Sequence, residues 1–280
     1  MSKNLKKARH LIEKRQYTEA QSLYQTALNK AKDNKEKAII WAELSWNYYY
    51  LKKYDSVINA IENVYELDAG YQAREDLYRI AGFAYLALGK MDEAIDNLVK
   101  SIEIDNHSDK QKSVIYELAK IYFAQGKHDM SEKLFAEIDA FYEEKNKEYW
   151  QSILFYRAFI QYYKRNLGLS KSLFEKLHQN AVDDVRKASA LFGYAFIAFD
   201  EKDYLKTINL CETILSLDNN FFDMETVGFL TAASFYYLGR YDIFDQYYHQ
   251  LIKKYPQGRY EQELQQLKEE RDKISNEKKD

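Results

Sequence analysis

The sequence predicts an all-α fold, an α-α superhelix of antiparallel helix pairs that ends in a capping helix. Three observations lead to this prediction. Only 9 glycines and 1 proline occur in 280 residues, too few breakers for a sandwich or barrel that turns often. Hydrophobic residues make up 46% of the chain and recur at helical spacing, which is enough to fill a substantial core. The helical segments also repeat at a nearly constant period, the pattern of stacked helical hairpins.

Three segments show the period most clearly. Each is an apolar helical run, a Gly-Lys or Gly-Arg dipeptide and a second apolar helical run. They begin at Tyr78, Ile115 and Thr231, and their glycines are Gly89, Gly126 and Gly239. Glycine after an apolar helical run is a helix stop signal, so each segment is predicted to be one helical hairpin.

This pattern resembles the tetratricopeptide repeat family, in which two antiparallel helices fill about 34 residues and small residues recur at set places. Aligned on the family's small residue in the first helix, the chain has Ala8, Ser45, Gly82, Ala119, Ala158, Ala195 and Ala232. The family's large second-helix position falls on Tyr24, Ile61, Leu98, Phe135, Phe174, Cys211 and Tyr248. A small residue lets paired helices approach closely, and large apolar residues fill the seam between them.

The resemblance implies seven tandem hairpins over residues 1–258. A charged C-terminal solvating helix and tail then fills residues 259–280. Four apolar residues of that helix are predicted to cover the last hairpin: Tyr260, Leu264, Leu267 and Ile274. The spacing departs from the family's usual length: Ala8 and Ser45 are 37 residues apart, and Ala119 and Ala158 are 39 apart. We interpret residues 139–150, which precede the least regular hairpin, as a helix extension or a slight joint.

The charge balance gives no sign of a nucleic-acid-binding protein, because 41 Lys and Arg face 44 Asp and Glu. Residues 1–15 are strongly basic. We interpret them as the solvated outer face of the first helix, with contact to phosphates or an anionic membrane surface as the alternative. The single cysteine, Cys211, fits a reducing compartment. Neither a secretory leader nor an apolar membrane span is visible, so we expect a soluble, cytoplasmic protein.

No motif in the sequence points to catalysis. There is no glycine-rich phosphate loop, and none of the five histidines has a His or Cys partner at metal-ligand spacing. Cys211 falls on a predicted core position. We therefore expect no enzymatic activity, no cofactor and no metal site.

The resemblance implies that the first helix of each repeat lines a concave groove that contacts ligands. Aromatic residues fill 16 of the 30 groove positions in repeats two to seven, although only 16% of the chain is aromatic. The expected partner-binding residues are Trp46, Tyr49, Tyr50, Arg79, Phe83, Tyr116, Lys120, Phe123, Phe155, Phe159, Tyr162, Phe192, Phe196, Phe229 and Tyr236. Such an apolar stripe is a binding surface, or its rings pack between successive first helices, or the chain's own tail or a second copy fills it.

The sequence thus predicts a protein–protein or protein–peptide interaction module with a scaffold or adaptor role, whose hot spots include Phe155, Phe159 and Tyr162. Family members that hold a C-terminal carboxylate use a Lys/Asn/Arg clamp. The matching positions here do not make that clamp: Leu5, Arg9, Glu43, Asp76 and Ile80. The alternative is an intracellular peptide-signal sensor that acts through a separate effector protein, since the first repeat leaves no room for an N-terminal effector domain. The partner's identity and the oligomeric state stay open.

Overall fold

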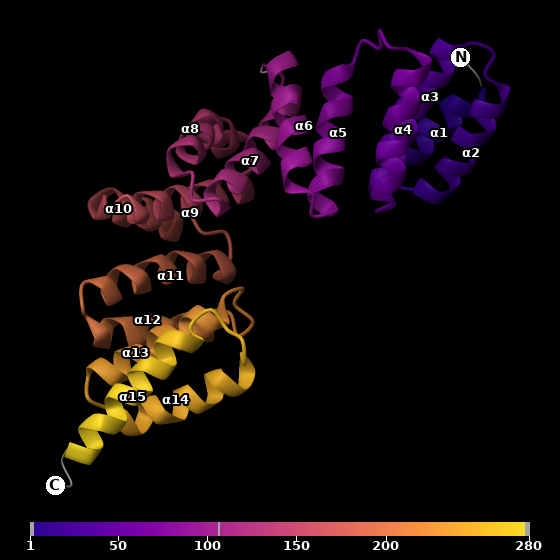
Figure 1. The fold of residues 1–280 in the computed structure, drawn as a ribbon. Helices are drawn as coiled ribbons and strands as arrows, with labels where there is room; N and C mark the ends of the chain where they lie inside the picture. The colour runs from indigo at the N-terminus through magenta and orange to yellow at the C-terminus, as the bar shows by residue number, and fades with distance from the viewer. Residues whose placement is uncertain (1–2, 106, 278–280) are drawn as a thin grey trace. The chain divides into compact units, whose positions relative to one another are not determined.

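The computed structural model describes residues 3–105 and 107–277, except for the side chains of 274–277. These residues form 15 helices and no strand, so the predicted all-α fold is confirmed (Figure 1). The helices are α1 (Lys3–Glu13), α2 (Tyr17–Lys30), α3 (Asn34–Tyr50), α4 (Tyr54–Leu67), α5 (Arg74–Ala87), α6 (Met91–Ile104), α7 (Asp109–Ala124), α8 (His128–Lys145), α9 (Lys147–Tyr163), α10 (Leu167–Gln179), α11 (Asp184–Asp200), α12 (Tyr204–Leu217), α13 (Met224–Tyr237), α14 (Tyr241–Lys254) and α15 (Glu261–Glu277).

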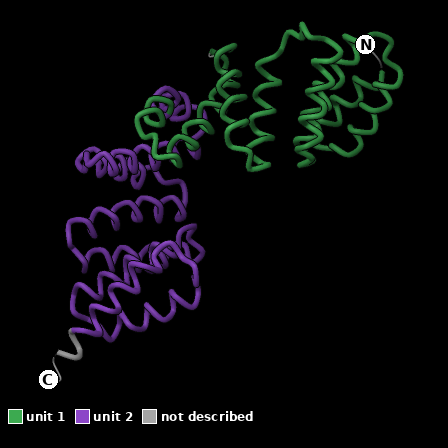
Figure 2. The backbone as a smooth tube through the Cα atoms, viewed as in Figure 1, with its two compact units in different colours: residues 1–134 green, residues 135–280 purple. Residues whose placement is uncertain are grey.

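The chain divides into two compact units, Met1–Leu134 and Phe135–Asp280, and the boundary falls inside α8 (Figure 2). Within unit 1, each helix from α1 to α7 packs against the next one in sequence, and α3 also contacts α5. Within unit 2 the same order runs from α9 to α15, and α11 contacts both α9 and α13. Hairpins therefore stack through their first helices, as in a helical solenoid. The division into hairpins over 1–258 and a last helix over 259–280 stays a prediction.

The seam inside the hairpins follows the predicted register. All seven small first-helix residues are buried, from Ala8 to Ala232. The large second-helix position is buried in six cases, and only Tyr248 is partly exposed. Two buried serines also link the paired helices: Ser131 Oγ donates to the carbonyl of Ala119 at 2.8 Å, and Ser170 Oγ donates to that of Ala158 at 2.9 Å.

The turns inside the hairpins share one conformation that the sequence shows only in part. Each contains a residue with positive φ: Arg15, Lys52, Gly89, Gly126, Arg165, Lys202 and Gly239. Each also closes with a bond from the next residue's N–H to a carbonyl five residues back, such as Asp203 to Ala198 at 2.9 Å. This is the Schellman helix ending. Glycine marks three of these turns, whereas Lys or Arg adopts the left-handed conformation in the other four.

Residues 139–150, which precede the least regular predicted hairpin, are mainly a helix extension. They carry α8 on to Lys145, and α9 starts at Lys147. Asn146 separates them as an N-cap, because its Oδ1 accepts from the backbone N–H of Glu148 at 3.1 Å and of Tyr149 at 3.2 Å.

The packing of α11 against α10, between neighbouring hairpins of unit 2, yields a prediction about Gly193 in α11. A Cβ at Gly193 would overlap the ring of Phe174, which is fully buried on α10. Ala has the better helix propensity, by about 1 kcal/mol. Even so, we expect Gly193→Ala to lower the free energy of unfolding by about 1–3 kcal/mol, because a rigid ring must shift.

Gly168 on α10 is the matched control, since a Cβ there would meet nothing within 4 Å. We expect Gly168→Ala to raise the free energy of unfolding by up to about 1 kcal/mol. Urea unfolding followed by circular dichroism measures both changes. Effects of the same sign in the two variants would contradict the close packing of Gly193 on Phe174.

Candidate functional site

The predicted partner-binding residues divide between the two units, and each unit is described separately. Unit 1 holds Trp46, Tyr49, Tyr50, Arg79, Phe83, Tyr116, Lys120 and Phe123. Unit 2 holds Phe155, Phe159, Tyr162, Phe192, Phe196, Phe229 and Tyr236.

In unit 1, the predicted residues of α3 and α5 are engaged with one another. The Arg79 guanidinium lies 4.6 Å from the ring centre of Trp46 and pairs with Asp76 at 2.6 Å. Tyr49 contacts Phe83, with ring centres 6.3 Å apart. Tyr50 is 44% exposed but stacks on Tyr17 at 4.8 Å.

On α7, the predicted residues are also engaged. Tyr116 is buried, and Lys120 lies over its ring while pairing with Glu117 at 2.9 Å. Phe123 packs against His128 at 5.9 Å. These contacts favour the interpretation in which the aromatic residues pack within the solenoid.

Arg9 and Glu43, at two of the positions compared with the carboxylate clamp, hold each other. Arg9 Nε donates to both Glu43 carboxylate oxygens at 2.9 and 3.0 Å, and the Tyr24 hydroxyl donates to Glu43 Oε2 at 3.2 Å. Burial, and then the charge of Glu43, raises the pKa of Tyr24 above its usual range. This network joins three helices of unit 1 and gives Arg9 an internal counter-ion.

In unit 2, several of the predicted rings are enclosed by neighbouring helices. Phe159 on α9 is only 4% exposed, and its ring lies 5.1 Å from Phe174 and 5.5 Å from Phe196. Phe192 on α11 is 3% exposed. The substitution Phe159→Ala would therefore test folding rather than binding.

Tyr162 also has an internal role. Its hydroxyl donates to Asp200 Oδ2 at 2.8 Å, and Arg165 pairs with the same oxygen at 2.7 Å. Burial, and then the hydrogen bond to Asp200, raises the pKa of Tyr162 above its usual range. The predicted hot spot at Tyr162 is thus a nearly buried link between α9 and the end of α11.

The last two predicted residues of unit 2 are covered by the C-terminal segment of the chain. Phe229 stacks on Tyr260, with ring centres 4.1 Å apart. The Tyr236 hydroxyl donates to Glu270 Oε2 on α15 at 2.9 Å. Burial, followed by the bond to Glu270, raises the pKa of Tyr236 to about 12. At this end of unit 2 the chain's own last helix therefore covers the aromatic stripe.

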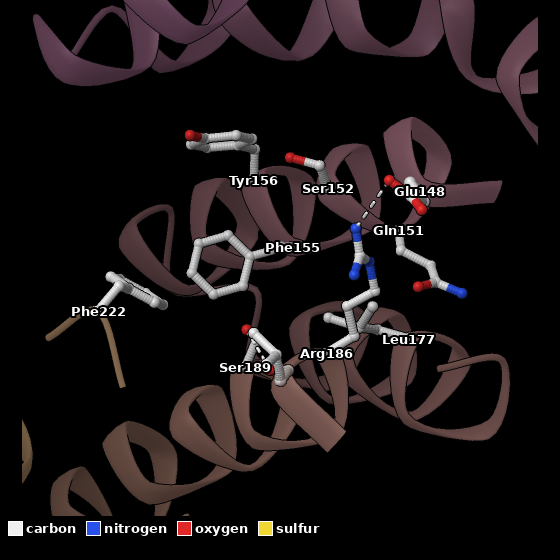
Figure 3. A pocket seen from close by; sticks show the side chains of 10 residues that line it. Glu148, Gln151, Ser152, Phe155, Tyr156, Leu177, Arg186, Ser189 and Phe222 are labelled. Carbon is white, nitrogen blue, oxygen red and sulfur yellow. Dashed lines mark hydrogen bonds and ion pairs between the residues drawn. The ribbon is translucent and has the colours of Figure 1, made fainter. Parts of the chain in front are cut away.

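Between these enclosed rings and the start of α9 lies an open pocket of about 320 Å³ (Figure 3). We call it the Phe155 pocket. Its walls come from α9, α10, α11 and the turn before α13: Glu148, Gln151, Ser152, Phe155, Tyr156, Leu177, Val185, Arg186, Ser189 and Phe222. Of the fifteen predicted residues, only Phe155 lines it.

A short turn between α12 and α13 brings Phe222 to this pocket. Asp218 Oδ1 accepts from the N–H of Asn220 at 3.0 Å, and the carbonyl of Asp218 accepts from that of Phe221 at 3.2 Å. Phe221 is buried as a result, whereas Phe222 is 64% exposed. The Phe222 ring approaches Phe155 at 5.9 Å and Phe192 at 5.7 Å, in both cases edge to face.

The polar side of the pocket is built on the first turns of α9 and α11. Asp183 caps α11 by accepting from the N–H of Arg186 at 2.8 Å, and its carboxylate also pairs with the Arg186 side chain. Arg186 reaches Glu148 on α9 at 3.4 Å, as the dashed line in Figure 3 shows. The amide of Gln151, only 1% exposed, donates to the carbonyl of Asn180.

Sequence reasoning missed Phe222, Gln151 and Arg186. Phe222 had a visible signal, because Phe221 and Phe222 are adjacent aromatic residues that directly follow Asn219 and Asn220, a residue type common in turns. Gln151 and Arg186 had none, because they lie outside the groove positions that the family register implies.

A second cavity, of about 450 Å³, lies in unit 1 between the start of α3 and the turn after α4. It is lined by Lys35, Ile39, Asp68, Gly70, Tyr71, Gln72 and Ala73. None of the fifteen predicted residues belongs to it.

The described residues contain no group of three or more His, Cys, Asp or Glu side chains placed to hold a metal ion. Within residues 3–105 and 107–277, none of the helices has the length and apolarity that crossing a lipid bilayer demands.

These features define a helical-hairpin repeat protein with an open pocket, partly aromatic and partly polar, between α9 and α11. More particularly, the fold is that of the tetratricopeptide repeat solenoid, and comparisons of sequence and structure agree. No protein-family model matches the chain. It is 22% identical over 243 residues to a TPR repeat-containing protein of Methanocaldococcus jannaschii, an alignment that covers 76% of this chain and 38% of that protein. The chain thus spans well under half the length of this relative.

Three solved structures share the fold at low sequence identity. The apo form of the quorum sensor NprR from B. thuringiensis matches with a TM-score of 0.72 and 13% identity over 94% of this chain and 79% of that one. The apo form of RapI matches with a TM-score of 0.59 and 17% identity over 89% and 73%. YrrB, described as a TPR protein with an unusual peptide-binding site, matches with a TM-score of 0.52 and 16% identity over 68% and 90%.

Proposed function

We propose that the chain is a scaffold or adaptor module that binds an extended peptide segment of a partner protein, with the Phe155 pocket of unit 2 as its anchor point. One observation carries the proposal: Phe155 and Phe222 form an open aromatic wall beside polar side chains. Pockets with apolar walls and a few convergent polar groups are the usual form of ligand sites.

The proposal narrows the predicted partner surface. Phe155 contacts the ligand together with Phe222. The enclosed rings, such as Phe159 and Phe192, hold α9 and α11 in place and so position the wall. Binding thus rests on few residues, as in other interfaces where a small set of aromatic anchors dominates the affinity.

A peptide-signal sensor that acts through a separate effector protein is the second candidate. It is favoured by the likeness of fold to NprR, whose description is that of a quorum sensor. YrrB, with its described peptide-binding site, supports both candidates equally. For either role we propose the cytoplasm as the location, since the one cysteine, Cys211, is buried and free.

A peptide selection tests the proposed function. Random dodecapeptides displayed on phage are selected on the intact chain, and the selected peptides are then titrated against Phe222→Ala and Leu205→Ala. Phe222 is 64% exposed at the pocket, and Leu205 is 65% exposed on α12. We expect Phe222→Ala to weaken binding about tenfold or more, as for a hot spot, and Leu205→Ala to leave it unchanged.

Circular dichroism must first show that both variants keep the helical content of the intact chain. Equal affinity of the selected peptides for the intact chain and Phe222→Ala would place the binding surface elsewhere. Hydrogen exchange separates the two candidates. A bound peptide that protects only the pocket indicates an adaptor, and one that also alters exchange in distant helices indicates a sensor.

A further inference from the structure

Gln151 gives the Phe155 pocket a chemical preference. Its side chain is 1% exposed, and its Nε2 donates to the carbonyl of Asn180. That bond fixes which end of the amide is nitrogen, because only nitrogen can donate to a carbonyl. The other end, Oε1, accepts no hydrogen bond from the described residues. A buried acceptor without a donor is destabilising, so a ligand that brings an N–H or O–H gains from meeting it.

The charges around the pocket disfavour a charged ligand group. The Arg186 side chain already pairs with two carboxylates, those of Asp183 and Glu148. It therefore has little attraction left for an anionic ligand. A ligand ammonium would meet the guanidinium of Arg186, and the Glu148 carboxylate that also lines the pocket is already paired with that guanidinium. The group that fits is a neutral hydrogen-bond donor.

The walls of the pocket favour an aromatic ring. Phe155, Tyr156 and Phe222 line it, and Phe155 and Phe222 already meet edge to face with an interplanar angle of 79°. Its volume, about 320 Å³, is near the lower end of the range for ligand pockets, about 300–1,000 Å³, and suits one large side chain rather than a helix. Aromatic rings pack favourably in edge-to-face arrangements of this kind.

We propose that the Phe155 pocket takes a tryptophan or tyrosine side chain of a partner peptide, whose ring N–H or O–H donates to Gln151 Oε1. This inference rests on the proposed peptide-binding function and names the side chain that it recognises. The peptide backbone stays at the rim, where Glu148 is exposed, because a side chain reaches a deep acceptor more easily than a backbone does. In Figure 3, Arg186 lies between Phe155 and Gln151. Oε1 is covered, so the Arg186 side chain changes its rotamer as the ring enters, a common adjustment on binding.

Fluorinated probes test the donor directly, without an intact partner. 5-Fluoroindole carries an N–H donor, and 5-fluoro-1-methylindole carries a methyl group in its place. Both probes are titrated against the full chain by fluorine NMR. We expect the methylated probe to bind about tenfold more weakly, because it leaves the acceptor unsatisfied. We expect Phe222→Ala to weaken 5-fluoroindole about tenfold and Leu205→Ala to leave its affinity unchanged.

Gln151→Met removes the acceptor, and on this variant the two probes should bind alike. If Gln151→Met fails to fold, the comparison of the two probes on the intact chain decides alone. Equal binding of both probes to the intact chain would overturn the proposal, as would no binding of 5-fluoroindole or binding that ignores Phe222→Ala. Tighter binding of 4-fluorobenzoate or 4-fluorobenzylamine than of 5-fluoroindole would also overturn it, in favour of a charged occupant.

The failure of this inference can be told apart from the failure of the proposed function. Selected dodecapeptides whose binding depends on Phe222 but that contain no tryptophan or tyrosine would contradict only the proposal that such a side chain enters the pocket. Selected dodecapeptides that ignore Phe222→Ala would remove the pocket from the function altogether.

Discussion

Deletion of residues 259–280 is expected to lower the free energy of unfolding of unit 2 by about 3–6 kcal/mol, the range for uncovering two leucine side chains. Leu264 and Leu267 of α15 are 3% and 8% exposed and pack with Phe244 and Leu251 of α14. The truncation would expose this apolar surface to water. It would also remove Tyr260, which stacks on Phe229.

Ion pairs add less to this effect, although they fix where α15 lies. Lys268 pairs with Asp245 at 3.2 Å and Arg271 pairs with it at 2.6 Å. Partly exposed pairs of this kind contribute on the order of 1 kcal/mol or less. The apolar face of α15, rather than its charge, should therefore dominate the loss. The Ile274 side chain, predicted to belong to this face, lies outside the described residues.

Alkylation of Cys211 measures the loss of stability in unit 2 specifically. It is the only cysteine, lies on α12, and is 1% exposed. Burial raises the pKa of its thiol to about 11, so alkylation at neutral pH should await unfolding. We expect iodoacetamide to label the truncated chain at clearly lower urea concentration than the intact chain.

Two double variants of the full chain separate packing from mere shortening. Leu264→Ala with Leu267→Ala should reproduce most of the truncation's effect on labelling. Gln265→Ala with Gln266→Ala alters exposed side chains of the same turns and should leave the labelling midpoint nearly unchanged. If the intact and truncated chains are labelled at the same urea concentration, α15 does not stabilise unit 2.

Phe159→Ala is expected to lower the free energy of unfolding by about 3–5 kcal/mol, the usual range for a large aromatic ring removed from a core. The ring is 4% exposed and touches Phe155 at 4.9 Å and Phe174 at 5.1 Å. Its loss would leave a cavity between α9, α10 and α11. The same urea and alkylation measurements give the size of the change.

Phe222→Ala is the matched control on the same aromatic cluster, because its ring is 64% exposed. We expect it to change stability by no more than about 0.5 kcal/mol while weakening the selected peptides. Phe159→Ala with near-normal stability would show that this ring is free to serve binding, as the sequence alone suggested.

Much of the fold could be predicted from the sequence because it depends on contacts at short range. Each hairpin seam is defined by two positions. The first is the small residue, Ala8 or one of its six equivalents, and the second is the large residue sixteen positions later. Those positions are buried in the structure, and Tyr248 is the one exception. The turns were recognised only where Gly89, Gly126 and Gly239 mark them. Lys52 or Lys202 gives no such signal, because the hydrogen bonds that close the helix, not the side chain, select the left-handed conformation.

The candidate site could be predicted less well. The aromatic enrichment of the first helices singled out Phe155, which lines the pocket, but it treated Phe155 and Phe159 as equivalent members of one stripe. Gln151 belongs to the site because Asn180, at the end of another helix, fixes its amide. Phe222 belongs to it because a turn between two later helices points the ring back toward α9.

By itself, the sequence determined the all-α class and the register of the buried seam, and it predicts the order and period of the hairpins. The reason is that helical periodicity and small-residue spacing act between residues close together in the chain. Only the tertiary structure decided which rings of the aromatic stripe are enclosed and which are open. Phe155 and Phe159 lie one helical turn apart on α9, and residues of other helices and of a distant turn set the difference between them. Exposure depends on what packs over a side chain, and that cover comes from parts of the chain far away in sequence.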